Sequence, residues 1–500
     1  METREIFRNL SPLDHRYSVS ERSVFDALVP WFSEEASIAA CVRAEAALVL
    51  AHLAVRRGAV SAETRAALDA ARAEVSPEAV YAEEAKTRHN IRALVNVFKT
   101  KVPPDLAPLV HLGATSVDIL DSSLAYRMKG ACIGVALPAL RRLETLLCDF
   151  TEREAETAQA GRTHGQHAVP VTVGFAMAEY VSRLGKSIIE IERLSLQLKG
   201  KLAGAVGAYN AAGMIVRDPE ELERIYLAEL GLEASEHSTQ LVEPEYLLRL
   251  LLEYNTAFGI IANLADDLRN LQRTEIGELR EGFAKDQVGS STMPQKRNPW
   301  NSEHVKSLWK TFMPRVLSFY MDQISEHQRD LSNSASQRFI ADYVTGFCMA
   351  LSRMASVIEG LSADREKCLA NLRSGGGIPG GVLAEPAYIL LAESGVSDAH
   401  EVIRKITLKA ERDGSSFAAA LASEGGALDP IAAELFKLGF IKIDGADADR
   451  AEKLRAAALA WFEKPEQYRG LAVKKAKELA AKYRALMIPR PEGRENPQAE

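Results

Sequence analysis

Apolar residues recur along most of the chain at intervals of three and four, whereas strict alternation of apolar and polar residues is hard to find. One such series covers residues 247–271 and passes through Tyr254 and Phe258; it spans about seven turns at 3.6 residues per turn. Shorter series cover residues 137–150 and 175–198. This spacing places the apolar side chains on one helix face, so we predict long helices that bury their stripes against one another.

Clusters of proline and glycine divide this helical pattern. Val102-Pro103-Pro104-Asp105 ends a first region, and the glycine-rich segment 374–381 lies within a last one. We therefore predict an all-α chain with three domains, namely an N-terminal helical domain, a central bundle of the longest helices and a C-terminal helical domain. Their predicted bounds are 1–110, 111–362 and 363–488, and the polar, proline-rich tail 489–500 is expected to be disordered.

Composition and charge narrow the class of protein. The 500 residues (54.7 kDa) carry 61 basic and 68 acidic side chains, a net charge of −7 with both signs mixed, which argues against a nucleic-acid partner. Five cysteines without a CxxC pair argue for a reducing compartment. The first ten residues lack an apolar signal core, and we find no run of about 18 apolar residues. We expect a cytoplasmic protein without a membrane partner.

The usual cofactor and hydrolase motifs are missing or weak. Residues 375–380 fit GxGxxG formally, but a helical pattern precedes them and they contain Pro379, so a connecting loop explains them better than a dinucleotide site. The sequence contains no Walker A, HExxH or GxSxG motif, and its ten histidines are scattered. We expect a protein that needs no metal and no cofactor.

Polar segments interrupt the helical pattern at three places. The first, residues 111–121, brings Thr115, Ser116 and Asp118 just ahead of an apolar helix. Helix capping and anion binding both explain this composition, and the pattern leaves both open. The second, residues 161–172, holds two histidines within four residues beside two glycines, which favours a site because histidine suits proton transfer near neutrality.

The third segment, residues 287–303, is the strongest signal in the chain. Gly289 frees the backbone, Ser290 and its neighbours supply hydroxyl and N–H groups, and Lys296 and Asn298 can hold an anion. A polar loop of this length between long helices is typically functional.

These segments also carry a resemblance to a known family. GSSTMPQKRNPWNSE resembles the signature loop of the fumarase/aspartase superfamily, and HLGATSVDILDSS and GRTHGQHAVPVT resemble its other two characteristic regions, in the right order. Within the superfamily the chain is similar to the adenylosuccinate lyase family, through SPLDHRY, RHN and QRDLSNSASQR. The resemblance runs from about residue 11 to 485 and is weakest after residue 370.

The resemblance implies an almost all-helical, three-domain subunit in a homotetramer whose sites are shared between subunits. It also implies cofactor-free β-elimination of fumarate from adenylosuccinate, giving AMP, and from succinylaminoimidazole carboxamide ribotide, a step of purine nucleotide synthesis. The family pattern makes Ser290 the base and His164 the acid, with Glu303 orienting His164, while Lys296 stabilises the alkoxide and His89 assists the leaving group.

The same resemblance assigns residues to substrate binding. Thr115, Ser116, Thr163, Lys296 and Asn298 match positions that hold the succinyl carboxylates. Gln240 matches a substrate glutamine, and Arg88 and Asn90 flank His89 in the RHN motif. Arginine is well suited to bidentate phosphate contacts; the positions that match the phosphate clamp are Arg16, Tyr17, Arg329, Ser334 and Arg338.

Three positions depart from the family pattern: Asn90 replaces an aspartate, His15 a glycine, and His304 stands where some members carry arginine. Two alternatives remain. A sister lyase acting on argininosuccinate or a cycloisomerase substrate would have little use for the phosphate clamp. A helical scaffold that had lost its chemistry would have no need of Ser290 and His164.

Overall fold

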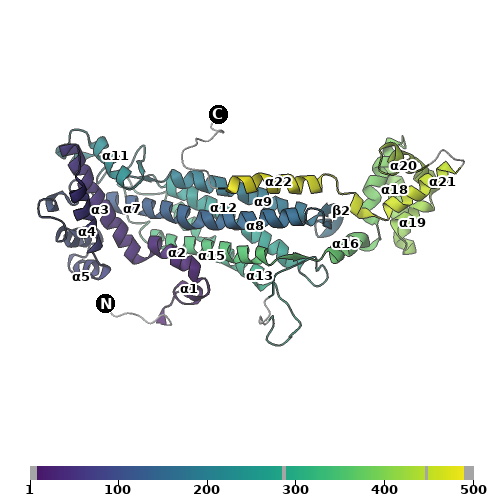
Figure 1. The fold of residues 1–500 in the computed structure, drawn as a ribbon, viewed down its shortest axis with the longest axis horizontal. Coiled ribbons are helices and arrows are strands. Elements are labelled where there is room, and N and C mark those ends of the chain that lie inside the picture. Colours follow the sequence, from purple (N-terminus) through teal and green to yellow (C-terminus); the bar gives the residue numbers. More distant parts are fainter. Residues whose placement is uncertain (1–7, 284–288, 445–448, 489–500) are drawn as a thin grey trace. The chain divides into compact units, whose positions relative to one another are not determined.

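The computed structural model describes residues 8–283, 289–444 and 449–488 and is mostly helical, 68% by content. This confirms the predicted all-α class (Figure 1). The chain forms two compact units, the first made of residues 1–142, 186–262 and 304–354 and the second of 143–185, 263–303 and 355–500. The division into three domains at residues 110 and 362 stays a prediction.

The helices sort into those of unit 1, those of unit 2 and five whose residues belong to both. Unit 1 holds α1 (Arg16–Ser20), α2 (Arg22–Phe32), α3 (Glu34–Arg57), α4 (Ala62–Ala73), α5 (Pro77–Thr87), α6 (Asn90–Lys99), α7 (Ser116–Ala131), α10 (Asn210–Ile215), α11 (Pro219–Glu229) and α14 (Arg315–Met321). The five shared helices are α8 (Leu137–Arg153), α9 (Val173–Leu196), α12 (Glu245–Leu271), α13 (Trp300–Phe312) and α15 (Ile340–Glu359). Unit 2 holds α16 (Arg365–Ser374), α17 (Ala384–Glu393), α18 (Ala399–Asp413), α19 (Phe417–Ala422), α20 (Gly425–Lys437), α21 (Arg450–Phe462) and α22 (Ala472–Met487).

The predicted apolar stripes form the core. Helices α8, α9 and α12 coincide with the three series found in the sequence, and Tyr254 and Phe258 on α12 are fully buried. Tyr254 stacks on Phe347 of α15 with ring centroids 4.9 Å apart. Offset aromatic pairs of this kind add to the free energy gained from burial alone. The prediction of long core helices is therefore confirmed.

One apolar stretch was not anticipated from the sequence. Residues 22–57 are long and apolar enough to cross a membrane by length and composition, but 72% of the most apolar window is buried inside the protein. Its longer part, α3, packs against α7 and α11 (Figure 1) and is capped by Ser33, whose side chain accepts from the amide of Ala36. The burial and the cap are those of a core helix.

The structure also contains short strands, which the sequence pattern did not predict. Within unit 2, β1 (Ala158–Thr163) and β2 (Gln166–Thr172) form an antiparallel hairpin, and β5 (Leu279–Arg280) pairs with β6 (Ser362–Ala363); in unit 1, β3 (Lys199–Gly200) pairs with β4 (Glu233–Ala234). The second polar segment thus lies on a hairpin ahead of α9. A bulge between Ala160 and Arg162 breaks the alternation that would have revealed β1.

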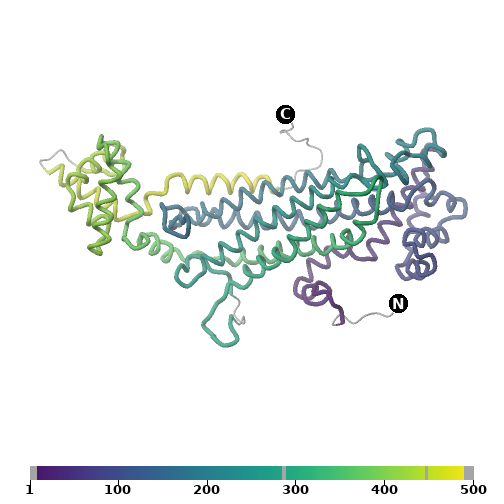
Figure 2. The backbone as a smooth tube through the Cα atoms, turned by 180° about the vertical axis from the view of Figure 1, so that it is seen from behind, coloured from purple at the N-terminus to yellow at the C-terminus, as the bar shows by residue number. Residues whose placement is uncertain are grey.

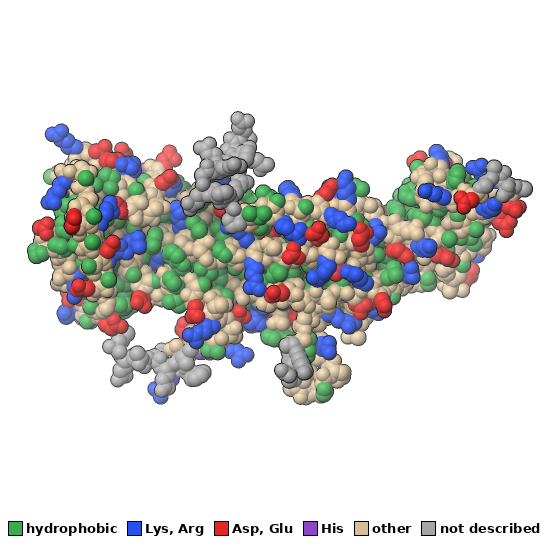
Figure 3. Space-filling view, in the orientation of Figure 1, with side chains coloured by type: hydrophobic (Ala, Val, Ile, Leu, Met, Phe, Trp, Pro, Cys, Tyr) green, Lys and Arg blue, Asp and Glu red, His purple; other side chains and the backbone are tan. Residues whose placement is uncertain are grey.

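The C-terminal helices α17 to α21 surround an apolar cluster that includes Phe417, Ile431 and Phe462. Figure 2 shows the backbone of these helices, coloured green to yellow, grouped closely together. The glycine-rich segment follows helix α16, and Gly375 ends that helix in the left-handed conformation, so the segment is a connection without a preceding strand. On the face drawn in Figure 3, basic and acidic side chains are interspersed, as the mixed charge predicted. The tail 489–500 lies outside the described residues.

Candidate functional site

Positive φ angles at residues other than glycine occur mostly at the segments that carry the family resemblance. Among the described residues, five that are not glycine have positive φ: Arg88, His111, His164, Tyr209 and His327. Four of these lie within or directly beside the segments that carry the family resemblance. Such conformations cost free energy and are retained mainly at functional sites. The strain is therefore an observation, independent of the motifs, that makes these segments candidates for a functional site.

His164 lies at the tip of the β1–β2 hairpin. Thr163 pairs with Gln166, and the two residues between them, His164 and Gly165, have φ of 54° and 74°. Two successive positive φ values are the signature of a tight two-residue hairpin turn that matches strand twist. Thr163 and His164 are both exposed, so the turn presents the imidazole outward from its own unit.

The Ser290 loop is built by close backbone contacts. The hydroxyl oxygen of Ser290 accepts from the amides of Thr292 (3.3 Å) and Met293 (3.1 Å). The side-chain amide of Asn298 donates to the carbonyl of Gly289 at 3.0 Å and closes the loop. Lys296 is exposed.

The predicted partner of His164 is not bonded to it within the chain. Glu303 lies exposed in the first turn of α13. Among the hydrogen bonds and ion pairs of the described residues, none joins His164 to Glu303, Ser290 or Lys296. His164 is thus exposed and Ser290 half-buried, both belong to unit 2, and no hydrogen bond or ion pair of the described residues joins them.

The start of α7 shows which of residues 115–118 cap the helix and which are free to bind an anion. Asp118 is fully buried, its carboxylate accepts from the amide of Thr115 at 2.8 Å, and it pairs with the fully buried Lys201. It also accepts from the amide of Gly204 at 3.3 Å. Asp118 is therefore a structural cap, while Thr115 and Ser116 remain half-buried at a helix N-terminus, where an anion is stabilised.

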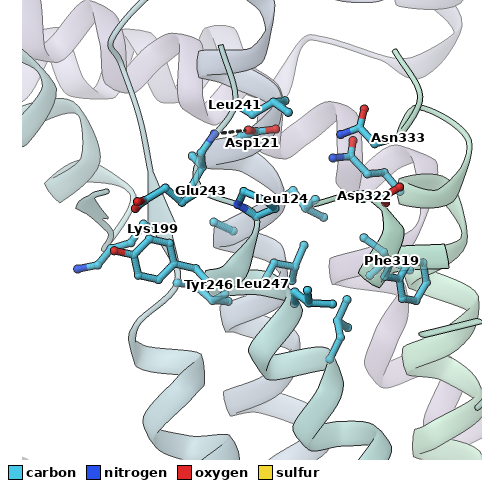
Figure 4. A pocket seen from close by; sticks show the side chains of 18 residues that line it. Asp121, Leu124, Lys199, Leu241, Glu243, Tyr246, Leu247, Phe319, Asp322 and Asn333 are labelled. Atoms are coloured by element: carbon cyan, nitrogen blue, oxygen red, sulfur yellow. Dashed lines mark hydrogen bonds between the residues drawn. The ribbon is translucent and has the colours of Figure 1, made fainter. Parts of the chain in front are cut away.

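Two substrate-binding candidates of unit 1 meet directly. The Arg329 guanidinium donates to the side-chain oxygen of Gln240 at 3.0 Å. The loop of Gln240 is held by Asp121, whose carboxylate accepts from the amide of Val242 at 2.9 Å (Figure 4). Burial raises the pKa of Asp121 to about 6. Asp121 and Asn333, which follows Arg329 in the chain, line a mostly apolar cavity of about 80 Å³.

The other residues of the predicted phosphate clamp are less closely joined. Tyr17 in α1 contacts His304, with the hydroxyl 3.1 Å from the imidazole Nε2. Burial, together with the charges of Arg353 and Arg16, lowers the pKa of His304 and favours its neutral form. The position where some family members carry a charged arginine therefore holds a neutral imidazole in this chain. The remaining clamp residues are exposed and belong to α1 or to the segment before α15: Arg16, Ser334 and Arg338.

The RHN motif forms the junction of α5 and α6. Arg88 ends α5 in the left-handed conformation, and the His89 Nδ1 accepts from the amide of Arg92 at 3.2 Å. Because Nδ1 is the acceptor, Nε2 of a neutral His89 carries the proton. The Asn90 side chain accepts from the amide of Ile91 at 2.8 Å. All three residues of the motif are exposed.

His111 is not among the candidate residues predicted from the sequence, although it begins the first polar segment. Its Nδ1 lies 2.7 Å from a carboxylate oxygen of Glu45, which is fully buried on α3. The positive φ of 61° at a non-glycine residue marks the position structurally. The residues near Glu45 in the sequence do not predict this contact with His111.

Comparisons with known proteins decide the family. The family profile described as "Lyase" matches residues 8–311, and that described as "Adenylosuccinate lyase C-terminal" matches residues 325–438. Adenylosuccinate lyase of Pyrococcus abyssi is 32% identical over 81% of this chain and 87% of its own length, and that of Pyrococcus horikoshii is 34% identical over 80% and 87%. The chain belongs to the adenylosuccinate lyase family.

Solved structures agree with this placement at the level of the fold. The crystal structure of fumarate lyase from Mesorhizobium sp. BNC1 has a TM-score of 0.75 at 20% identity and covers 91% of this chain and 97% of its own. The 3-carboxy-cis,cis-muconate lactonizing enzyme from Pseudomonas putida has a TM-score of 0.73 at 24% identity and covers 92% and 97%. The predicted membership of the adenylosuccinate lyase family, within the fumarase/aspartase superfamily, is confirmed.

Proposed function

We propose that this member of the adenylosuccinate lyase family removes fumarate from adenylosuccinate to give AMP. We extend the proposal to succinylaminoimidazole carboxamide ribotide, which offers the same succinyl group on nitrogen and the same ribose phosphate. The family assignment supports the reaction class, and the geometry of the Ser290 loop supports its mechanism.

The base is Ser290. Breaking the C–N bond beside a carboxylate requires removal of a carbon-bound proton, for which an ordinary serine hydroxyl is too weak a base. The amides of Thr292 and Met293 both donate to the Ser290 oxygen, and this is the observation on which the mechanism rests. Preorganised N–H groups stabilise an oxyanion without reorganisation, and the ammonium of Lys296, which belongs to the same loop, adds a positive charge.

His164 gives the proton to the departing nitrogen, and Glu303 from another subunit orients its imidazole. His89 assists with its Nε2–H, because its Nδ1 is already occupied by the Arg92 amide. General acid catalysis typically contributes 10²–10⁴-fold. Proton transfer through these groups needs neither a metal nor a cofactor.

The remaining residues hold the two ends of the substrate. Thr115 and Ser116 at the α7 N-terminus, with Thr163, Lys296 and Asn298, bind the succinyl carboxylates. The pair Gln240 and Arg329, together with Arg16, Tyr17, Ser334 and Arg338, binds the nucleotide end. Arg88 and Asn90 flank His89 at the leaving group, where the neutral Asn90 amide removes a charge that the family pattern provides.

The exposure of these groups supports a shared site. His164, Lys296 and Glu303 are exposed in the single chain, although catalysis of this kind works best where water is excluded. We propose a homotetramer in which the His164 hairpin and the Ser290 loop of one site come from different subunits, in the cytoplasm.

Complementation tests this assembly. Inactive His164→Ala and Ser290→Ala proteins are unfolded, mixed in equal amounts and refolded. About a quarter of their sites should regain activity, because each site needs an unmutated His164 from one chain and an unmutated Ser290 from another, each drawn with a probability of about one half. The pair Ser290→Ala and Lys296→Ala should regain none. Tetramers that re-form without activity would contradict the shared site.

Substrate comparison tests the function itself. The purified protein is given adenylosuccinate, its dephosphorylated nucleoside and argininosuccinate, and kcat/KM is measured for each. We expect adenylosuccinate to be preferred over the nucleoside by at least tenfold, because Arg329 and its neighbours then have their phosphate, and argininosuccinate to remain intact. Turnover of argininosuccinate with adenylosuccinate untouched would favour the sister lyase, and turnover of none would favour a scaffold.

A further inference from the structure

Two segments of unit 2 carry the proposed acid and base, and both are attached to one short stretch of chain, residues 278–281. This stretch consists of strand β5 with a glutamate on each side, and β5 is itself paired with β6. We propose that Glu278 and Glu281 are positioning residues, Glu278 for the His164 hairpin and Glu281 for the Ser290 loop and Glu303. The kinetic consequences of this proposal rest on the proposed function. The contacts that support the proposal are independent of that function.

Glu278 holds the hairpin from inside the fold. Its side chain is fully buried, and its carboxylate accepts from both terminal nitrogens of Arg162, one of them at 3.0 Å. The amide of Gln159 donates to it at 2.7 Å and that of Asn371 on α16 at 2.8 Å. Gln159 and Arg162 both belong to β1, and Arg162 precedes His164 by two residues. The carboxylate therefore ties the strand that ends at the hairpin tip to α16.

The charge and the number of donors make Glu278 difficult to replace. Four donor contacts converge on two oxygens, so an amide at this position would turn its NH₂ group towards other donors. A bidentate arginine–carboxylate pair also fixes orientation as well as distance. Loss of the Arg162–Glu278 pair should therefore allow the hairpin tip to move while helix α16 stays in place.

Glu281 holds the other segment at its base. One carboxylate oxygen accepts from both the amide, at 2.9 Å, and the hydroxyl of Ser302, in the first turn of α13. The other accepts from Asn301 at 3.3 Å. Ser302 directly precedes Glu303, so this contact fixes the helix end from which Glu303 projects. A carboxylate at this place also interacts favourably with the helix dipole.

Gln272 completes this attachment by holding both ends of the loop. Its side-chain oxygen accepts from the amide of Glu281 at 2.9 Å, and its side-chain nitrogen donates to the carbonyl of Arg297 at 3.3 Å. Ser290 and Lys296 lie between these two anchored positions. Catalytic groups must be held within about 0.5 Å of their productive geometry, so release of an anchor should affect the rate more than the fold.

Kinetic isotope effects separate the two roles. We expect Glu278→Gln and Glu281→Gln each to lower kcat for adenylosuccinate at least tenfold. Glu278→Gln should raise the solvent deuterium isotope effect on kcat, because proton donation by a displaced His164 becomes limiting. Glu281→Gln should instead raise the effect of deuterium at the carbon that Ser290 deprotonates. Arg280→Gln is the matched control, since Arg280 lies between them but is 59% exposed and pairs with Asp364, and it should change neither.

Hydrogen–deuterium exchange tests the attachment without any reference to activity. Glu278→Gln should speed exchange of amides in residues 158–172, and Glu281→Gln in residues 289–303, each leaving the other segment unchanged. If Glu278→Gln does not fold, Arg162→Lys keeps the charge, loses the fork and should show the same solvent isotope signature. A kcat within twofold of wild type, or unchanged exchange in both segments, would overturn the proposal. If the wild-type protein leaves adenylosuccinate intact, the proposed function fails and the exchange result still decides the positioning.

Discussion

Replacement of Gly289 by alanine should damage the catalytic loop without unfolding the protein. A Cβ at this position would lie 2.1 Å from the carbonyl oxygen of Lys296 and 3.2 Å from the ring of Phe283. The nearer atom belongs to the backbone, so it cannot rotate away as a flexible side chain would. The two sides of the loop, one leading into Ser290 and the other carrying Lys296, must therefore separate.

The contact distances set the size of the effect. Ordinary van der Waals contact begins at 3.4 Å, so the methyl group and the carbonyl must move apart by about 1.3 Å. A misplacement of about 1 Å in a catalytic group costs roughly 10²-fold in rate, which corresponds to about 2.7 kcal/mol at 1.36 kcal/mol per tenfold. Residues 291–297 are exposed, so few buried contacts are lost and the melting temperature should change little.

The assay follows the loss of ultraviolet absorbance of adenylosuccinate, with thermal unfolding measured on the same samples. Gly426→Ala is the matched control, because nothing lies within 4 Å of a Cβ built at that position, and it should keep full activity. Retention of more than a third of wild-type kcat by Gly289→Ala would refute the close-contact argument. The close-contact argument would also be refuted if Gly289→Ala lost activity only because its melting temperature fell and the protein unfolded.

Three further predictions concern stability, binding and cofactors. Glu144 is buried with both carboxylate oxygens unpaired, and burial raises its pKa well above the ordinary value. The folded state therefore binds the proton of Glu144 more tightly than the unfolded state does. The stability that protonated Glu144 contributes is present below the unfolded pKa of about 4.5 and is lost as the pH rises through the higher folded pKa. Glu144→Met should therefore flatten this part of the stability–pH curve and add about 1–3 kcal/mol at neutral pH, as denaturant unfolding would show; equal curves for both proteins would contradict this. Arg329→Ala should raise KM for adenylosuccinate at least tenfold, since loss of a charged partner costs about 2–4 kcal/mol; an equal loss with the dephosphorylated nucleoside would mean that Arg329 serves the fold. Activity should survive dialysis against EDTA, and a loss restored by a divalent ion would overturn the metal-free mechanism.

Periodic apolar spacing made the core predictable. Helices α8, α9 and α12 follow from stripes whose burial is their only stable arrangement. The hairpin escaped because its alternation is short, broken by a bulge beside Gly161 and interrupted by Pro170. The pair His164-Gly165 was the available signal, since glycine tolerates the positive φ that such a turn requires.

The site shows the same division between local and distant information. The polar segments could be recognised from the sequence because their residues lie close together in it. The residues that support them could not be predicted in this way, since Glu45 and Glu278 lie on other elements and nothing in their own neighbourhood marks them. The structure was also needed to show that Asp118 is a buried cap paired with Lys201, because composition alone allowed either capping or anion binding.

The most direct test of the account is a product balance measured on wild-type and Ser290→Ala protein in parallel. Each is incubated with adenylosuccinate, and AMP, fumarate and remaining substrate are quantified by chromatography. We predict one AMP and one fumarate for every adenylosuccinate consumed by the wild type, and a rate lower by several orders of magnitude for Ser290→Ala with substrate binding retained. Consumption without equimolar fumarate, or a Ser290→Ala protein that keeps a tenth of the wild-type rate, would contradict elimination with Ser290 as the base.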